Sequence, residues 1–139
     1  MIFKSSGVSM QPTLNPRAEQ KDWIFVSRWL GIDYKIARGD IVCLSSPCNP
    51  KETLVKRVIG LEGDIIRTLS YGKTFVSIPK GHMWVEGDNN KQSFDSNRFG
   101  PVPVGLLVGK ATHIFWPSSR FTVLDHMSPP TRLPMNKSV

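Results

Sequence analysis

A chain of 139 residues is long enough for one domain with its own hydrophobic core and too short for two. Apolar residues make up 40% of the sequence and charged residues 21%, which is typical of a folded domain and excludes a largely disordered chain. Eighteen Lys and Arg residues against 11 Asp and Glu give a formal net charge of +7, which favours an anionic neighbour such as a membrane surface or nucleic acid.

Short runs of β-branched and aromatic residues, separated by Gly and Pro, predict a mainly β fold with little helix. Residues 1–20 are polar and rich in turn signals. The predicted strands are, in chain order, 24–30, 40–45, 54–61, 64–69, 73–78, 83–86 and 106–116. Turn signals at intervals of about ten residues are typical of an antiparallel β-barrel or sandwich built of short strands.

The sequence predicts a single domain over residues 1–127 and a disordered, Pro-rich tail over residues 128–139. No segment approaches the ~20 apolar residues that span a bilayer. The segment before Ser9 is too short for the charged and apolar regions of a signal peptide. We therefore expect the chain as given to lack a membrane anchor.

The sequence shows no pattern typical of a metal site. His82, His113 and His126 are isolated, and Cys43 and Cys48 alone do not supply the four ligands of structural zinc. We expect no metal and no cofactor, and we expect both cysteines to be free thiols.

Two segments carry residues suited to nucleophilic chemistry. Ser9 stands on a short irregular segment, and Pro12 fixes the turn that follows it. Lys56 interrupts an apolar strand and shares a face with Leu54 and Val58. Burial favours a neutral amine, and a neutral lysine beside a serine can take the hydroxyl proton and return it to a leaving amine. On spacing alone the simpler interpretation is the stronger one, a serine in a turn and a lysine that extends its ammonium group to solvent.

Three boxes in the chain resemble those of the type I signal peptidase family. The nucleophile box matches residues 9–14 (SMQPTL) and the lysine box residues 56–64 (KRVIGLEGD). The third box matches residues 87–89 (GDN), 93–97 (SFDSN) and 99–102 (FGPV). Bacterial members usually carry Asp-Ser-Arg in the third box, whereas this chain has Asp-Ser-Asn followed by Phe-Gly-Pro. That variant is similar to the mitochondrial inner membrane protease branch of the family, of the subunit 2 type.

The resemblance implies a mainly β, signal-peptidase-like fold and a Ser-Lys dyad that works without a metal or cofactor. Ser9 matches the nucleophile and Lys56 its general base. Ser93 matches the serine that orients the lysine, and Asp95 matches a structural carboxylate.

Two positions depart from the family pattern. The usual arginine partner of the structural carboxylate is replaced by Asn97, and Arg57 and Arg98 are candidates to substitute for it. Gly7 stands where many bacterial members have a serine whose hydroxyl helps the oxyanion hole. The backbone N–H of Ser9 would then carry more of the oxyanion stabilisation.

The resemblance also implies a function and a setting. The chain would be a serine endopeptidase that removes hydrophobic sorting or signal peptides from precursor proteins delivered to the mitochondrial intermembrane space. It would work at the inner membrane surface, with its catalytic domain facing that space, as a heterodimer with a subunit 1-type protease.

Three other interpretations compete with this one. The departures at Gly7 and Asn97 are compatible with a weakly active or inactive binding subunit of the same heterodimer. A self-cleaving, repressor-like protease would share the dyad but needs a DNA-binding domain, which is not visible. A basic β-barrel that binds nucleic acid needs aromatic residues interleaved with Lys and Arg on one strand face, and this pattern is missing. We therefore expect no nucleic-acid partner.

Overall fold

The computed structural model describes residues 1–17, 19, 21–28 and 36–136 and shows an almost entirely β fold. The strands are β1 (Ile2–Lys4), β2 (Trp23–Ser27), β3 (Ile41–Ser45), β4 (Thr53–Leu61), β5 (Ile65–Arg67), β6 (Phe75–Ser77), β7 (His82–Glu86), β8 (Val102–Pro103), β9 (Leu107–Trp116) and β10 (Thr122–Val123). The single α-helix in this part of the chain, α1 (Ser96–Phe99), has four residues. Short 3-10 turns form at Asn90–Gln92, Val104–Leu106, Ser118–Arg120 and Pro130–Arg132. The predicted fold class is confirmed.

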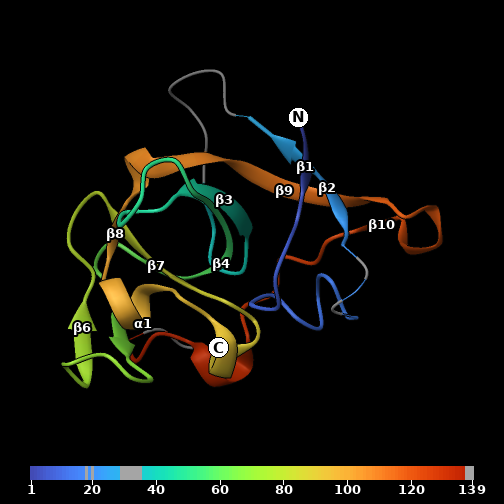
Figure 1. The fold of residues 1–139 in the computed structure, drawn as a ribbon. Helices are drawn as coiled ribbons and strands as arrows, with labels where there is room; N and C mark the ends of the chain where they lie inside the picture. Colours follow the sequence, from blue (N-terminus) through green and yellow to red (C-terminus); the bar gives the residue numbers. More distant parts are fainter. Residues whose placement is uncertain (18, 20, 29–35, 137–139) are drawn as a thin grey trace.

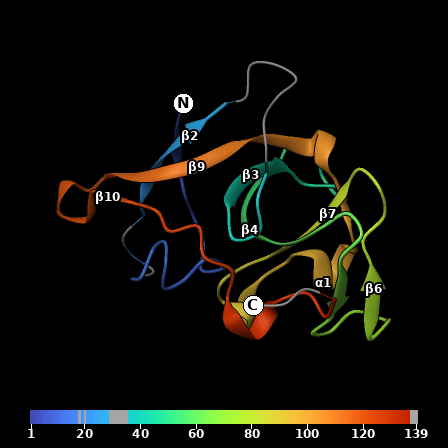
Figure 2. The same ribbon diagram turned by 180° about the vertical axis from the view of Figure 1, so that it is seen from behind.

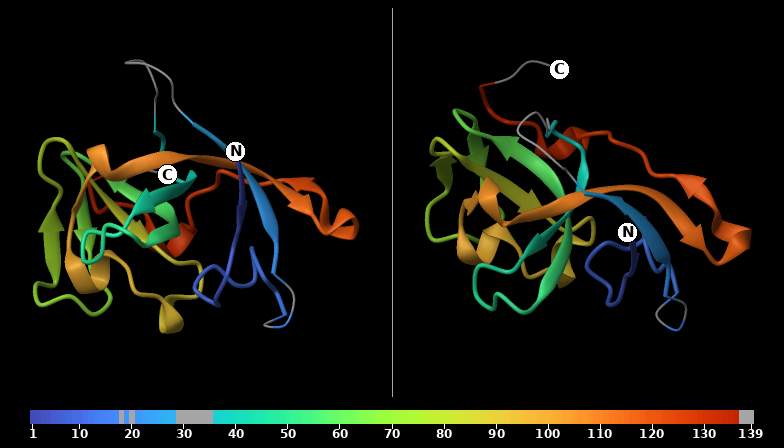
Figure 3. Two further views of the ribbon diagram at one scale, coloured as in Figure 1. Left: turned by 45° about the horizontal axis from the view of Figure 1, so that its top comes forward. Right: turned by 90° about the horizontal axis from the view of Figure 1, so that it is seen from above.

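All strand pairs are antiparallel, and eight strands form one curled sheet (Figure 1). The strand order is β1-β2-β9-β3-β4-β7-β8, and β10 pairs with β9 on the edge opposite β2. The long strand β9 crosses the whole top of the molecule and joins the N-terminal hairpin to the β3–β4 pair (Figures 1 and 3). Strands β5 and β6 form a separate two-stranded sheet at the other end of the molecule from the pair β1–β2.

Three groups of buried apolar side chains fill the curled sheet. One lies under β2, β9 and β3 and includes Met10 and Leu14 from the segment that follows β1. A second joins β3, β4, β7 and β8, and a third places Trp84 beneath β5. The apolar residues Met10 and Leu14 flank the polar segment 11–13, so burying them anchors the loop that carries Ser9 to the sheet.

Each predicted strand has a counterpart, with bounds that differ by one to three residues. The end of the first predicted strand, residues 29–30, lies outside the described residues. Strands β1, β8 and β10 were not predicted because each has only two or three residues and little apolar alternation.

Part of the predicted tail of residues 128–139 makes specific contacts with the sheet, while residues 137–139 lie outside the described residues. Residues 128–136 run beneath the sheet from β10 toward α1, as Figure 2 shows from behind. Arg132 is buried there, and the N–H of Met135 donates to the carbonyl oxygen of Ile65 at 2.8 Å. Specific polar contacts thus hold a segment whose composition predicts disorder.

Candidate active site

Lys56 lies in the middle of β4 and is only 3% exposed. It pairs with Val42 on β3, so its side chain projects from the centre of the sheet rather than from its edge. Its Nζ donates to Oγ of Ser93 at 3.1 Å. Burial lowers the pKa of Lys56 from its ordinary 10.5, and the nearby carboxylates of Asp95 and Glu52 only partly oppose that effect. Burial therefore shifts the protonation equilibrium of Lys56 toward the neutral amine.

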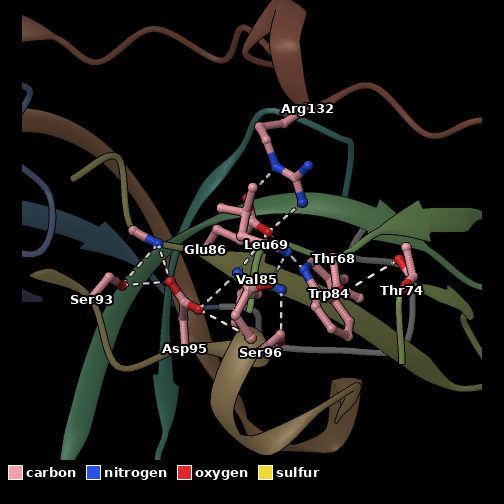
Figure 4. A network of polar contacts seen from close by, with 12 residues as sticks. Thr68, Leu69, Thr74, Trp84, Val85, Glu86, Ser93, Asp95, Ser96 and Arg132 are labelled. Atoms are coloured by element: carbon pink, nitrogen blue, oxygen red, sulfur yellow. Dashed lines mark hydrogen bonds and ion pairs between the residues drawn. The ribbon is translucent and has the colours of Figure 1, made fainter. Parts of the chain in front are cut away.

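Ser93 and Asp95 form a short hydrogen-bonded unit beside Lys56. Oγ of Ser93 donates to Oδ2 of Asp95 at 2.6 Å. The backbone N–H of Gly87 donates to both side chains, at 3.1 Å to Ser93 and 2.9 Å to Asp95. The other oxygen of Asp95 caps α1 by accepting the N–H of Asn97 at 3.0 Å. Figure 4 shows Ser93 and Asp95 side by side at this end of the network.

Ser9 lies in the turn that follows β1 and is held through its backbone. Its carbonyl oxygen accepts the N–H of Asn89 at 2.8 Å, and the Asn89 side chain donates to the carbonyl of Val8 at 3.1 Å. Gly7 has a φ of +87°, in the left-handed region that L side chains rarely adopt. The position that carries a serine in many bacterial members is thus taken here by a glycine in a glycine-favouring conformation.

Ser9 and Lys56 line the same cavity of about 260 Å³. Other walls of the cavity come from the loop around Gly7, from β4 and from Phe94. The structure therefore brings the predicted nucleophile and the predicted base to one hollow, with Ser93 and Asp95 behind the lysine. Met10 is buried in the core and also borders this cavity.

Gly87 permits this arrangement because it leaves room for two neighbouring segments. A Cβ atom at this position would meet Oγ of Ser93, and it would lie 2.5 Å from the carbonyl oxygen of Ser9. A residue with any side chain would therefore push apart the segments that carry Ser9 and Ser93.

Among the described residues, neither of the predicted substitutes for the missing arginine forms an ion pair with Asp95. Arg57 forms ion pairs with Asp88 at 2.8 Å and Asp125 at 2.9 Å, and Arg98 is exposed. Asn97 itself takes the arginine's place, because its Nδ2 donates to Asp95 at 3.2 Å. Hydrogen bonds, rather than an adjacent guanidinium group, hold this carboxylate.

Glu86 and Arg132, two buried residues of this network, were not identified from the sequence. Nδ2 of Asn97 also donates to Glu86 at 2.9 Å, and Arg132 forms an ion pair with Glu86 at 2.7 Å. Neither residue belongs to a box of the motif, and their contact joins positions 46 apart in the chain. No local signal could have linked them.

The described residues contain no cluster of three or more His, Cys, Asp or Glu side chains placed to hold a metal ion. Cys43 is buried and Cys48 exposed, and both are free thiols. Burial raises the pKa of Cys43 to about 12, so this thiol is not a nucleophile at neutral pH.

A family model described as "Signal peptidase, peptidase S26" matches residues 1–71 and 67–116 of the chain. The chain belongs to this family. Mitochondrial inner membrane protease subunit 2 of Danio rerio is 48% identical to this peptidase over 135 residues, covering 96% of this chain and 74% of the relative.

Two further proteins show how widely the likeness extends. Human mitochondrial inner membrane protease subunit 1 is 45% identical over 126 residues, covering 88% of this chain and 74% of the relative. A solved structure of signal peptidase I from Enterococcus faecalis aligns with a TM-score of 0.47 at 24% identity, covering 55% of this chain and 97% of that one. Among the described residues of the peptidase, no helix has the length and apolar character needed to cross a bilayer.

Proposed function

We propose that this chain is a serine endopeptidase in which Ser9 is the nucleophile and neutral Lys56 the general base. The observation that carries the proposal is the burial of Lys56, only 3% exposed, at a cavity that Ser9 also lines. A lysine that is kept neutral in this way accepts a proton near neutral pH, as a general base must. Ser93 and Asp95 support the base by fixing the direction of its amine.

The reaction is acyl transfer in two steps. Nζ of Lys56 takes the proton of the Ser9 hydroxyl while Oγ attacks the peptide carbonyl carbon, and the backbone N–H of Ser9 stabilises the oxyanion. The tetrahedral intermediate collapses as the Lys56 ammonium group protonates the leaving amine. Lys56 then deprotonates a water molecule, which hydrolyses the acyl-enzyme and regenerates Ser9.

The names of the relatives support a proposal for the substrates and the setting. Proteins called mitochondrial inner membrane protease subunit 2 share almost half of their aligned residues with this chain. We infer that the chain acts at the mitochondrial inner membrane, facing the intermembrane space, on precursors with hydrophobic sorting peptides. The existence of relatives named subunit 1 and subunit 2 supports a heterodimer of the two types.

The test is cleavage of a precursor peptide that carries an apolar stretch and a small residue before the cut. The full chain is assayed together with a subunit 1-type partner whose own catalytic activity has been abolished by mutation. Ser9→Ala and Lys56→Met should each lower kcat/KM by a factor of about 10² or more, because removal of a positioned general base typically costs about 10²–10⁴. Cleavage that survives both substitutions, or no cleavage by the unaltered chain, would favour the binding-subunit alternative.

A further inference from the structure

A second buried carboxylate lies close to the proposed site. Glu86, at the end of β7, is 1% exposed, and Oε2 accepts from Nε1 of Trp84 at 2.9 Å and from Nδ2 of Asn97 at 2.9 Å. The same amide group of Asn97 donates to Asp95 at 3.2 Å. Two buried carboxylates are therefore joined by a single amide, and their like charges repel each other unless a cation compensates one of them.

The compensating charge comes from the C-terminal segment. Nε and the terminal nitrogen of Arg132 donate to the two oxygens of Glu86 at 2.8 and 2.7 Å, a bidentate pair. Figure 4 shows Arg132 reaching Glu86 from the side opposite Asp95 and Ser96. Removal of one partner of a buried pair leaves the other charge uncompensated, so Glu86 depends on Arg132 for compensation of its charge.

The orientation of Asn97 connects the pair to the site. The N–H of Leu69 donates to Oδ1 of Asn97 at 2.8 Å, so the amide nitrogen faces the two carboxylates. Both of its bonds require acceptors, which ionised Glu86 and Asp95 supply. The path then continues from Asp95 through Ser93 to Nζ of Lys56.

We propose that Arg132 is a positioning residue of this peptidase: by neutralising Glu86, it lets Asn97 hold Asp95 in place and keeps negative charge from accumulating behind Lys56. This inference rests on the proposed function. In the intact protein, Asp95 and Glu52 are the carboxylates that oppose the lowering of the Lys56 pKa, whereas the charge of Glu86 is paired with Arg132. The cavity on the other side of Arg132 is lined by charged residues that pair among themselves, namely Arg57, Asp88 and Asp125.

The test is the pH dependence of kcat/KM for charge variants of the full chain with its inactivated partner. Arg132→Gln leaves Glu86 uncompensated, which favours protonated Lys56, so the acid limb should move to higher pH and the rate at pH 7 fall about tenfold. Glu86→Gln leaves Arg132 uncompensated and should move the acid limb to lower pH. The double variant removes both charges and should return the limb to its original position.

A matched control separates this role from stability alone. Arg38 forms a comparable bidentate pair with Asp64 at 2.6 and 2.7 Å, away from the site, so Arg38→Gln should leave the profile unshifted. The inference would be overturned if the acid limb of the kcat/KM profile stays in place, or if it moves in the same direction in both single variants. If Arg132→Gln does not fold, the direction of the shift in Glu86→Gln decides. Failure of the proposed function is seen separately, as cleavage that persists in Ser9→Ala and Lys56→Met.

Discussion

At the residue scale, burial of the Lys56 amine affects both the stability of the fold and the chemistry that we propose for it. Because the pKa of Lys56 is lower in the folded chain than in the unfolded one, the folded state binds fewer protons between these two pKa values. This group therefore costs stability at neutral pH, and the cost disappears as the pH rises toward 10.5. The amine that we propose as the general base thus lowers the stability of the fold at neutral pH.

Replacing this lysine with an apolar residue of similar length should stabilise the protein. Lys56→Met removes the desolvation cost, and Ser93 keeps its bonds to Gly87 and Asp95. We expect the unfolding midpoint at pH 7 to rise by about 4 °C or more, which corresponds to roughly 1 kcal/mol in a chain of this size. The difference from the unaltered chain should shrink toward pH 10. Thermal melts at several pH values check this, and a lower midpoint at pH 7 would contradict it.

The motif residues were the part of the site that the sequence could predict. Ser9 and Lys56 lie at one cavity, and Ser93 and Asp95 are hydrogen-bonded to each other. Their roles stay a prediction until activity is measured. The role of Glu86 could not be predicted from the sequence, because its contact with Arg132 joins distant parts of the chain. A carboxylate at the end of a strand is common and gives no local signal.

At the scale of elements, the segments that carry Ser9 and Ser93 both pack against the end of β7. Gly87 donates to Ser93 and Asp95, and its missing Cβ leaves space for the Ser9 segment. Sequence patterns mark Gly87 as a turn signal, but they do not show that two distant segments pack against it. Only the folded sheet brings these three segments together.

Gly87→Ala should therefore impair both stability and activity. The new methyl group forces the Ser9 and Ser93 segments apart, and overpacking of this kind typically costs about 1–3 kcal/mol. We expect kcat/KM to fall by a factor of about 10² or more, since misplacement of about 1 Å costs this much. Gly72→Ala is the matched control because no atom lies within 4 Å of its added Cβ. Equal activity of the two variants would show that the close approach at Gly87 has no role.

On the whole-molecule scale, exposed apolar side chains gather on the N-terminal hairpin and β9. A shallow groove there is lined by Ile2, Trp23, Phe115 and Trp116. Nζ of Lys4 lies 5.5 Å from the centre of the Trp23 ring, which places a cation beside the aromatic surface. Aromatic and basic residues together favour a membrane interface, in agreement with the proposed setting and the net charge of +7.

Vesicle binding should depend on this surface and not on apolar exposure in general. Trp116 is 55% exposed and Phe75, on the β5–β6 ribbon, is 52% exposed. Trp116→Ser should weaken co-sedimentation with anionic lipid vesicles about tenfold, because burial of a large side chain contributes about 1.5–3 kcal/mol. Phe75→Ser should have little effect. A similar loss in both variants would argue against a membrane face at β9.

The fold class and most strands were predictable because alternation and turn residues are local signals. The C-terminal segment was not, since Pro-rich composition gives no hint that Arg132 will find a buried carboxylate. Its order comes from contacts made by the whole molecule. Local patterns therefore predict the sheet, whereas the contacts of Arg132 can be read only from the folded chain.

In the proposed mechanism, Lys56 is neutral at the working pH of the enzyme and acts as the general base. The most direct measurement is an NMR pH titration of the lysine amines, with the Lys56 signal assigned by its loss in Lys56→Met and compared with the acid limb of kcat/KM. We expect a pKa for Lys56 below the ordinary 10.5 that coincides with the acid limb. An ordinary lysine pKa, or an acid limb that does not follow the Lys56 titration, would contradict it.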